Sequence, residues 1–426
     1  MRSACLPSLT LAALLALALG NPPSLTAQVW SVTSAPTNSW SSVAASADGS
    51  RVIAAVGHQW TGPYVFTSTN AGTVWVPAAL PSDNDLNWSS VASSADGTVL
   101  VAAMYGRYDG LTAGQIFAST NEGSSWTPGI NDYFQSVAAS ADGSKLVAVG
   151  YVIADRTETR RPIYLSTNSG ATWTISSAPI ENWAAVASSA DGSKLVAANS
   201  SERIYTSTNA GATWVSNTIA NAYWRSVASS ADGRRLSAAA LVEVNGEDPF
   251  GRIYISTDAG ASWMATGAPS NYWASIASSA DGTRLVCAAV GGYPSRPQSI
   301  FTSTDGGASW ISNSAPDVSW ASVFSSADGC KLFAAANMGN SQPGFGLIYT
   351  VQSSPRPLLH ISPSNSTLTL SWMVPSINFV LQENADLSTT DWTDVPASPA
   401  LNFTNLQFEV VLGATNATRF YRLKQQ

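Results

Sequence analysis

The chain has 426 residues, of which 45% are hydrophobic, 10% aromatic and only 11% charged. This apolar fraction is sufficient for large packed cores, which excludes an intrinsically disordered chain. The formal net charge is −7 and no basic stripe is present, so we expect no nucleic-acid partner. No apolar run after residue 20 approaches the ~18 residues of a membrane span, so we expect no membrane-spanning segment in the mature chain.

The first residues have the features of a secretory signal peptide. Arg2 precedes an apolar stretch over residues 9–19, and small residues stand at the expected positions before cleavage. We therefore expect residues 1–27 to be removed, with cleavage after residue 20 or 27, and the mature protein to be secreted, periplasmic or attached to the cell surface. Cys287 and Cys330 remain, at non-equivalent positions of different repeats, and we expect no disulfide between them.

One unit of about 47 residues is written seven times between residues 28 and 353. Each copy opens with an aromatic residue, continues with a stretch rich in Ala and Ser, and reaches an Asp-Gly pair. The aromatic residues are Trp40, Trp88, Phe134, Trp183, Trp224, Trp273 and Trp320. The Asp residues of the pairs are Asp48, Asp96, Asp142, Asp191, Asp232, Asp281 and Asp328.

A second motif, Ser-Thr-Asn/Asp-x-Gly-x-x-Trp, follows in the first six copies. Its Asn or Asp residues are Asn70, Asn121, Asn168, Asn209, Asp258 and Asp305, and its Trp residues are Trp75, Trp126, Trp173, Trp214, Trp263 and Trp310. The Asn or Asp side chain can hydrogen-bond the backbone of its own turn, and the Gly allows the turn's unusual dihedral angles. We therefore predict that these residues are structural and bind neither a metal nor a ligand.

Each copy also contains four short segments typical of β-strands. In the fourth copy these are residues 183–188, 194–198, 203–207 and 213–216. Asp-Gly favours a hairpin between the first two, and four antiparallel strands per copy predict a β-propeller blade. The seventh copy lacks the second motif, whereas residues 29–36 align with residues 309–316. We predict an all-β, seven-bladed propeller in which the N-terminal strand completes the last blade.

The second motif resembles the Asp-box, or BNR, repeat of sialidase-like β-propellers, and the resemblance covers residues 28 to about 352. It implies a glycoside hydrolase with an Arg triad, a Tyr/Glu nucleophile pair and an Asp acid. These cannot be placed one by one, because the family's Arg-Ile-Pro sequence is absent. The nearest sequences begin at Arg161, Arg203 and Arg252. Xyloglucanase-type propellers also carry these boxes, with paired Asp residues, but their cleft lies between two propellers and only one is present here.

From residue 354 the repeat stops and the composition changes. Alternating segments at 358–362, 367–372, 379–383, 408–412 and 419–423 predict a small β-sandwich-like module over residues 354–426. Segments 384–387, 392–395 and 420–423 resemble the C-terminal modules of secreted bacterial proteins. The resemblance implies a role in surface attachment or spacing.

The connections between second and third strands, and between blades, vary in length, so we expect ligand-binding residues on the face that carries them. Its aromatic candidates are Trp60, Tyr105 and Tyr108. Arg225 breaks its own repeat, since the equivalent residues are Ser41, Ser89, Gln135, Ala184, Ala274 and Ala321. With Arg203, Arg252 and Glu181 it could form a cluster that grips a carboxylate, because Arg forks match carboxylates bidentately. The alternative is drift between repeats, with ordinary surface ion pairs.

We predict a non-catalytic binding protein that is monomeric and whose partner is a glycan or an extracellular protein. We expect no cofactor and no metal, because the sequence has neither a His/Cys cluster for zinc nor a Gly-rich phosphate loop. The alternative is a sialidase-like or xyloglucanase-like glycoside hydrolase, and a structural extracellular protein is a third possibility. A hydrolase would need two inward carboxylates ~5–9.5 Å apart, for which Asp83, Asp85, Asp132 and Asp317 are candidates.

Overall fold

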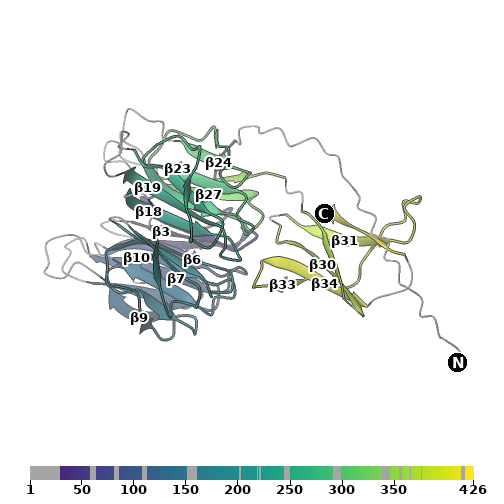
Figure 1. Cartoon of the computed structure of the whole chain (residues 1–426), viewed down its shortest axis with the longest axis horizontal. Coiled ribbons are helices and arrows are strands. Elements are labelled where there is room, and N and C mark those ends of the chain that lie inside the picture. The colour runs from purple at the N-terminus through teal and green to yellow at the C-terminus, as the bar shows by residue number, and fades with distance from the viewer. Residues whose placement is uncertain are drawn as a thin grey trace, which may run out of the picture.

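The computed structural model describes residues 29–57, 64–80, 86–107, 113–150, 161–200, 203–217, 219, 222–243, 250–290, 299–337, 346–354, 357–364, 366–375, 377–413 and 418–426. Every regular element in these residues is a β-strand. Figure 1 shows a larger body of stacked sheets and a smaller body that contains β30 (Thr367–Met373), β31 (Phe379–Asn384), β33 (Ala400–Asn402) and β34 (Gln407–Gly413). No helix in the described part of the chain is long and apolar enough to cross a membrane.

The larger body consists of four-stranded antiparallel sheets whose strands lie side by side in chain order. The first blade contains β2 (Trp40–Ala45), β3 (Val52–Val56), β4 (Val65–Ser68) and β5 (Val76–Pro77). The second contains β6 (Leu86–Ser93), β7 (Leu100–Arg107), β8 (Gly114–Ser119) and β9 (Thr127–Asp132). The third contains β10 (Phe134–Ala139), β11 (Leu146–Gly150), β12 (Tyr164–Ser166) and β13 (Thr174–Ile175).

The next blades repeat this order. The fourth contains β14 (Trp183–Ser188), β15 (Leu195–Asn199), β16 (Ile204–Ser207) and β17 (Val215–Asn217). The fifth contains β18 (Ala222–Ser229), β19 (Leu236–Glu243), β20 (Ile253–Ser256) and β21 (Met264–Ala265). The sixth contains β22 (Trp273–Ser278), β23 (Leu285–Ala289), β24 (Ile300–Ser303) and β25 (Ile311–Ser312). The strands of the fourth blade agree with the sequence prediction to within two residues at each end.

The seventh blade is completed by the N-terminal strand. Its strands are β26 (Trp320–Ser325), β27 (Lys331–Ala336) and β28 (Ile348–Gln352), and β1 (Ser31–Val32) pairs with β28 at its outer edge. The predicted closure of the propeller is therefore confirmed. Closure removes the open edges that an incomplete ring of sheets would expose.

A ring of backbone hydrogen bonds joins the blades around the axis. The Ala before each Asp-Gly pair donates its N–H to the carbonyl oxygen of the equivalent Ala in the next blade, at 2.7 to 2.8 Å. The ring runs through Ala47, Ala95, Ala141, Ala190, Ala231, Ala280 and Ala327, and Ala327 donates back to Ala47. We call these seven residues the alanine ring. Each bond pairs two groups that would otherwise be unsatisfied near the axis.

The cores of the blades form around the aromatic residues that open the inner strands. Trp40 is fully buried, and its ring meets Phe66 of the third strand edge-on at 5.5 Å and Trp75 at 6.2 Å. The same edge-on contact recurs in the fourth blade between Trp183 and Tyr205 at 5.2 Å. Aromatic pairs in this geometry contribute about 0.5–1.5 kcal/mol beyond their buried area.

The Ser-Thr-Asn/Asp motif forms a turn that satisfies its own polar groups. In the first blade, Asn70 Oδ1 accepts a hydrogen bond from the N–H of Val74 at 2.8 Å, and Ser68 Oγ accepts one from the N–H of Gly72 at 2.9 Å. The indole N–H of Trp75 donates to the carbonyl oxygen of Gly72 at 3.0 Å. Gly72 has a φ of 83°, a conformation that glycine adopts without steric cost.

The C-terminal part forms two further sheets. One has the order β29 (His360–Pro363), β30, β34 and β33; the other has the order β32 (Thr393–Asp394), β31 and β35 (Phe420–Gln425). Leu370, Trp372, Leu381 and Val410 are buried between them. The predicted β-sandwich is therefore present, with β32 and β33 as strands that the sequence analysis missed.

The C-terminal sheets pack against the alanine ring. Val374 is 3% exposed and lies in one apolar cluster with the alanine ring. The residues that join it in this cluster are Met373, Leu401, Phe403, Leu406 and Phe408. Leu406 also lines a cavity of about 150 Å³ at this end of the axis, together with residues of the inner strands. The C-terminal sheets thus cover the end of the propeller that carries the Asp-Gly turns.

Candidate functional site: a polar well on the propeller axis

A β-bulge occurs at the same place in all seven inner strands. In the first blade, Trp40 pairs with Val56 and Ser42 pairs with Ala55, so Ser41 has no partner opposite it. The other bulge residues are Ser89, Gln135, Ala184, Arg225, Ala274 and Ala321. A bulge redirects the side chain of its extra residue. The side chain at this position is therefore not constrained by a partner in the neighbouring strand of its blade.

All seven bulge residues line one cavity of about 380 Å³ on the axis, away from the alanine ring. We call this cavity the central well. Asn87, Tyr105 and Asn337 add further polar groups to its wall, and Val186 and Val227 lie deeper along the inner strands. Arg225 is the only charged side chain among the described residues that line it. The residue that breaks its repeat in the sequence therefore stands in the well.

The bulge residues differ in what their side chains can offer. Ser41 Oγ lies 2.7 Å from the carbonyl oxygen of Trp88 in the next blade, and Ser89 Oγ lies 2.7 Å from that of Phe134. These serines therefore fasten adjacent blades. Ala184 and its counterparts in the sixth and seventh blades carry no polar side-chain atom. Gln135 and Arg225, which flank Ala184 in consecutive blades, provide the largest polar groups of this set.

Of the other predicted binding residues that the structure describes, only Tyr105 lines the well. Arg203 and Arg252 are exposed at the starts of β16 and β20, and neither lines the well. Glu181 exchanges backbone hydrogen bonds with Arg161 at 2.8 and 3.2 Å. Trp60 and Tyr108 lie outside the described residues, as do Asp83 and Asp85.

A charged cluster beside the well connects the second, third and fourth blades. Asp132, at the end of β9, accepts a hydrogen bond from the hydroxyl of Tyr164 at 2.7 Å. Arg161 Nε lies 3.0 Å from the other carboxylate oxygen, although its N–H is not aimed at it, so this contact is an ion pair. The guanidinium also lies 5.4 Å from the centre of the Tyr133 ring. The indole of Trp183 donates to the Arg161 carbonyl oxygen at 2.9 Å.

This cluster has the chemistry of a structural brace. Burial and the hydrogen bond to Asp132 raise the pKa of Tyr164, so the phenol stays protonated at neutral pH. Asp132 has three partners, because its Oδ1 also accepts a hydrogen bond from the backbone N–H of Tyr133 at 2.8 Å. Its two oxygens are therefore engaged rather than available to a substrate. In the sequence, Arg161 and Asp132 stand out for separate reasons, and nothing in their spacing indicates that their side chains would meet.

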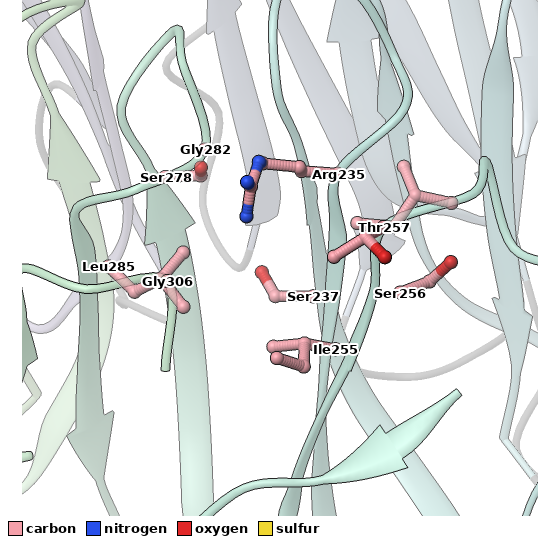
Figure 2. Close-up of a pocket in the computed structure, with 10 residues that line it drawn as sticks. Arg235, Ser237, Ile255, Ser256, Thr257, Ser278, Gly282, Leu285 and Gly306 are labelled. Atoms are coloured by element: carbon pink, nitrogen blue, oxygen red, sulfur yellow. The ribbon is translucent and has the colours of Figure 1, made fainter. Parts of the chain in front are cut away.

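Small pits between blades occur at equivalent positions and are too small for a ligand. One, between the fifth and sixth blades, has a volume of about 10 Å³ and lies among Arg235, Ser237, Ile255 and Leu285 (Figure 2). Its counterpart beside Lys145 and Leu165 has a volume of about 20 Å³. A volume of about 10–15 Å³ holds one water molecule. These pits are therefore features of blade packing.

No family model matches the chain, and no curated protein matches it. Solved structures do resemble it. YCF48 from Cyanidioschyzon merolae is 13% identical, with a TM-score of 0.53 over 77% of this chain and 99% of that chain. A structure described as YCF48 bound to D1 peptide is 15% identical, with a TM-score of 0.53 over 76% of this chain and 96% of that chain. The Cps50 (Swd1) β-propeller domain of Myceliophteria thermophila is 13% identical, with a TM-score of 0.55 over 76% of this chain and 100% of that chain. These similarities show a β-propeller fold.

Proposed function

We propose that this chain is a secreted, non-catalytic β-propeller that binds an extracellular partner, a protein or a glycan, at the central well. The observation that carries the proposal is the composition of the wall. It presents neutral hydrogen-bonding groups and one cation, Arg225, and no carboxylate among the described lining residues. Such a wall can hold a ligand in a defined orientation.

The same wall argues against a glycoside hydrolase. That chemistry requires two carboxyl groups on either side of the scissile bond. Among the described residues, the candidate carboxylate Asp132 is occupied by Arg161 and Tyr164. The proposal of a binding protein also agrees with one similar propeller, YCF48, whose structure is described as bound to a peptide.

The test is binding of the full-length mature protein to arrays of peptides and glycans, with release of reducing ends assayed on every glycan that binds. We expect binding without release. Binding with release would support the hydrolase alternative and contradict the proposal. Absence of binding to both arrays would remove the support for a ligand at the well.

The matched variants are Ala184→Trp and Ala268→Trp. Ala184 lines the well, and an indole there should fill it and abolish binding. Ala268 packs against the core of the sixth blade and does not line the well, so its variant reports on general damage from a large side chain. If both variants bind as the wild type does, the ligand lies elsewhere on the propeller.

A further inference from the structure

We propose that the central well binds the C-terminal carboxylate of a polypeptide, held between Arg225 and Gln135. This inference rests on the proposed function and specifies its ligand. Three observations support it: the positions of these two side chains, the charge around them, and the C-terminal sheets that cover the other end of the propeller axis.

The two side chains can converge on a planar anion. Both are bulge residues of inner strands, in the fifth and third blades, and both line the well. Ala184 lies in the blade between them and leaves the space above it open. A guanidinium presents paired N–H donors that match the two oxygens of a carboxylate, and an amide adds another donor.

The charge of the surroundings selects an anion. The whole chain has a formal net charge of −7, yet Arg225 is exposed to the well and has no acidic neighbour among the described lining residues. Arg161, by contrast, is paired with Asp132, with Nε and Oδ1 3.0 Å apart. A cation without a counter-charge in a concave site attracts an anionic ligand more strongly than one on an open surface.

The far end of the axis selects a chain terminus. The C-terminal sheets cover the alanine ring, and Leu406 stands at that end of the axis. A chain that enters from the variable face cannot pass through the propeller, so it either ends in the well or turns back out of it. Because Arg225 attracts an anion, a polypeptide that ends in the well would present its C-terminal carboxylate to Arg225 and Gln135.

The rim of the well favours a polypeptide. The inner strands β6 and β18 each begin two residues before their aromatic residue, whereas the other five begin at it. The second and fifth blades thus rise above the others on roughly opposite sides of the ring. Tyr223, in the raised part of β18, is 50% exposed and lies two residues before Arg225. An exposed aromatic ring beside the well can contact an apolar side chain near the peptide terminus.

The experiment compares peptides that differ only at the terminus. The full-length protein is presented with a library of immobilised heptapeptides that have free C-terminal carboxylates, and with the same peptides as C-terminal amides. We expect binding to the acids that is at least tenfold weaker for the amides. Arg225→Gln should weaken binding to the acids by ~10- to 100-fold, as the loss of a charge-assisted hydrogen bond predicts. Arg225→Lys should be intermediate, because it keeps the charge and loses the fork.

The control is Arg234→Gln, which makes the same charge change in the same blade. Arg234 is exposed and follows the Asp232-Gly233 turn at the covered end of the propeller. The Arg234→Gln variant should bind the acids as the wild type does. If Arg234→Gln weakened binding as much as Arg225→Gln does, the effect would be one of general charge, and the proposed site would be overturned. Gln135→Ala should weaken binding to the acids and leave binding to the amides unchanged.

The other outcomes separate this inference from the proposed function. Equal binding of acids and amides would overturn the inference and leave the binding function standing. Binding only to glycans that end in an acidic sugar, lost in Arg225→Gln, would keep an anion site and overturn the polypeptide ligand. Failure to bind peptides and glycans alike would overturn both proposals.

Discussion

Ser42 Oγ in the first blade accepts a hydrogen bond from the backbone N–H of Val91 in the second blade at 3.1 Å. The same bond joins five further pairs of neighbouring blades, from Ser90, Ser136, Ser226, Ser275 and Ser322, at 3.1 to 3.3 Å. The fourth blade has Ala185 at this position. The series of interblade hydrogen bonds is thus interrupted between the fourth and fifth blades.

Ala185→Ser should complete this series. A hydroxyl at this position can accept the N–H of Val227, and a net gain of about 0.5–1.5 kcal/mol in the free energy of unfolding is expected for one such bond. Ser226→Ala removes an existing bond and should destabilise the protein by a similar amount. Guanidinium unfolding of both variants measures the difference, and a destabilised Ala185→Ser protein would contradict the prediction.

Ser237→Val should stabilise the propeller. Ser237 is 2% exposed, its Oγ has no hydrogen-bond partner among the described residues, and it lies at the pit in Figure 2. The equivalent residues Val147, Val196 and Val286 are buried in their own blades. Val therefore fits this backbone, fills the pit and removes an unsatisfied hydroxyl, for a gain of about 1–2 kcal/mol.

The control for this change is Ser237→Ala, which removes the hydroxyl but leaves the pit unfilled. Its gain should be smaller than that of the Val variant, and the ordering Val, Ala, Ser in the midpoint of thermal unfolding checks both parts of the argument. A water molecule held firmly by Ser237 in the pit would reverse the ordering, because both variants would then lose its hydrogen bonds.

Asp258→Asn should make the protein less sensitive to acid. The hydroxyl and N–H of Ser262, followed by the hydroxyl of Ser256, hold the pKa of Asp258 at about 2, below the ordinary value of 3.8. A carboxylate whose pKa is lowered on folding stabilises the fold above its unfolded pKa and loses this contribution as the pH falls through its folded pKa. For Asp258 the loss occurs between about pH 4 and pH 2.

The fourth blade shows that Asn can form the same turn. Asn209 Oδ1 accepts the N–H of Thr213 at 2.9 Å, and its Nδ2 donates to the Thr213 hydroxyl at 2.9 Å. Thermal unfolding at pH 4 and at pH 2.5 should therefore show a smaller drop in Tm for Asp258→Asn than for the wild type. Asp258→Ala serves as the control, since it should be less stable than the wild type at pH 7.

The sequence alone was sufficient to predict the blades, because each local signal is repeated and the copies check one another. It also indicated Arg225, because six equivalent residues show what that position ordinarily holds. The alanine ring was not predicted. An Ala before each Asp-Gly pair looks like a turn preference in one copy, and its hydrogen bonds exist only when all the copies meet around the axis.

Features of the C-terminal part that were not predicted from the sequence have a related cause. The strands β32 and β33 have two and three residues, which is too short for alternation to be seen. The contact between Leu406 and the alanine ring joins residues from distant parts of the chain, and no periodicity connects them. The Asp132–Arg161 pair was missed for the same reason, because the partners come from different blades.

Leu406→Asp should detach the C-terminal sheets from the propeller. Leu406 lies in the apolar cluster with the alanine ring and lines the cavity at that end of the axis. Its φ of 55° is unusual for a residue other than glycine and costs roughly 1–2 kcal/mol, so a compensating contact is needed to keep Leu there. The cavity is lined by the seven methyl groups of the alanine ring and by serines whose hydroxyls already donate to other oxygens. A carboxylate placed there would lose its hydration without gaining a free hydrogen-bond donor from this wall. We expect limited proteolysis to release the C-terminal fragment faster than in the wild type.

Leu387→Asp makes the same chemical change in the C-terminal part of the chain, at a residue that is 59% exposed, and this variant should be cleaved at the wild-type rate. If the two variants are cleaved equally fast, the contact with the alanine ring does not hold the sheets in place.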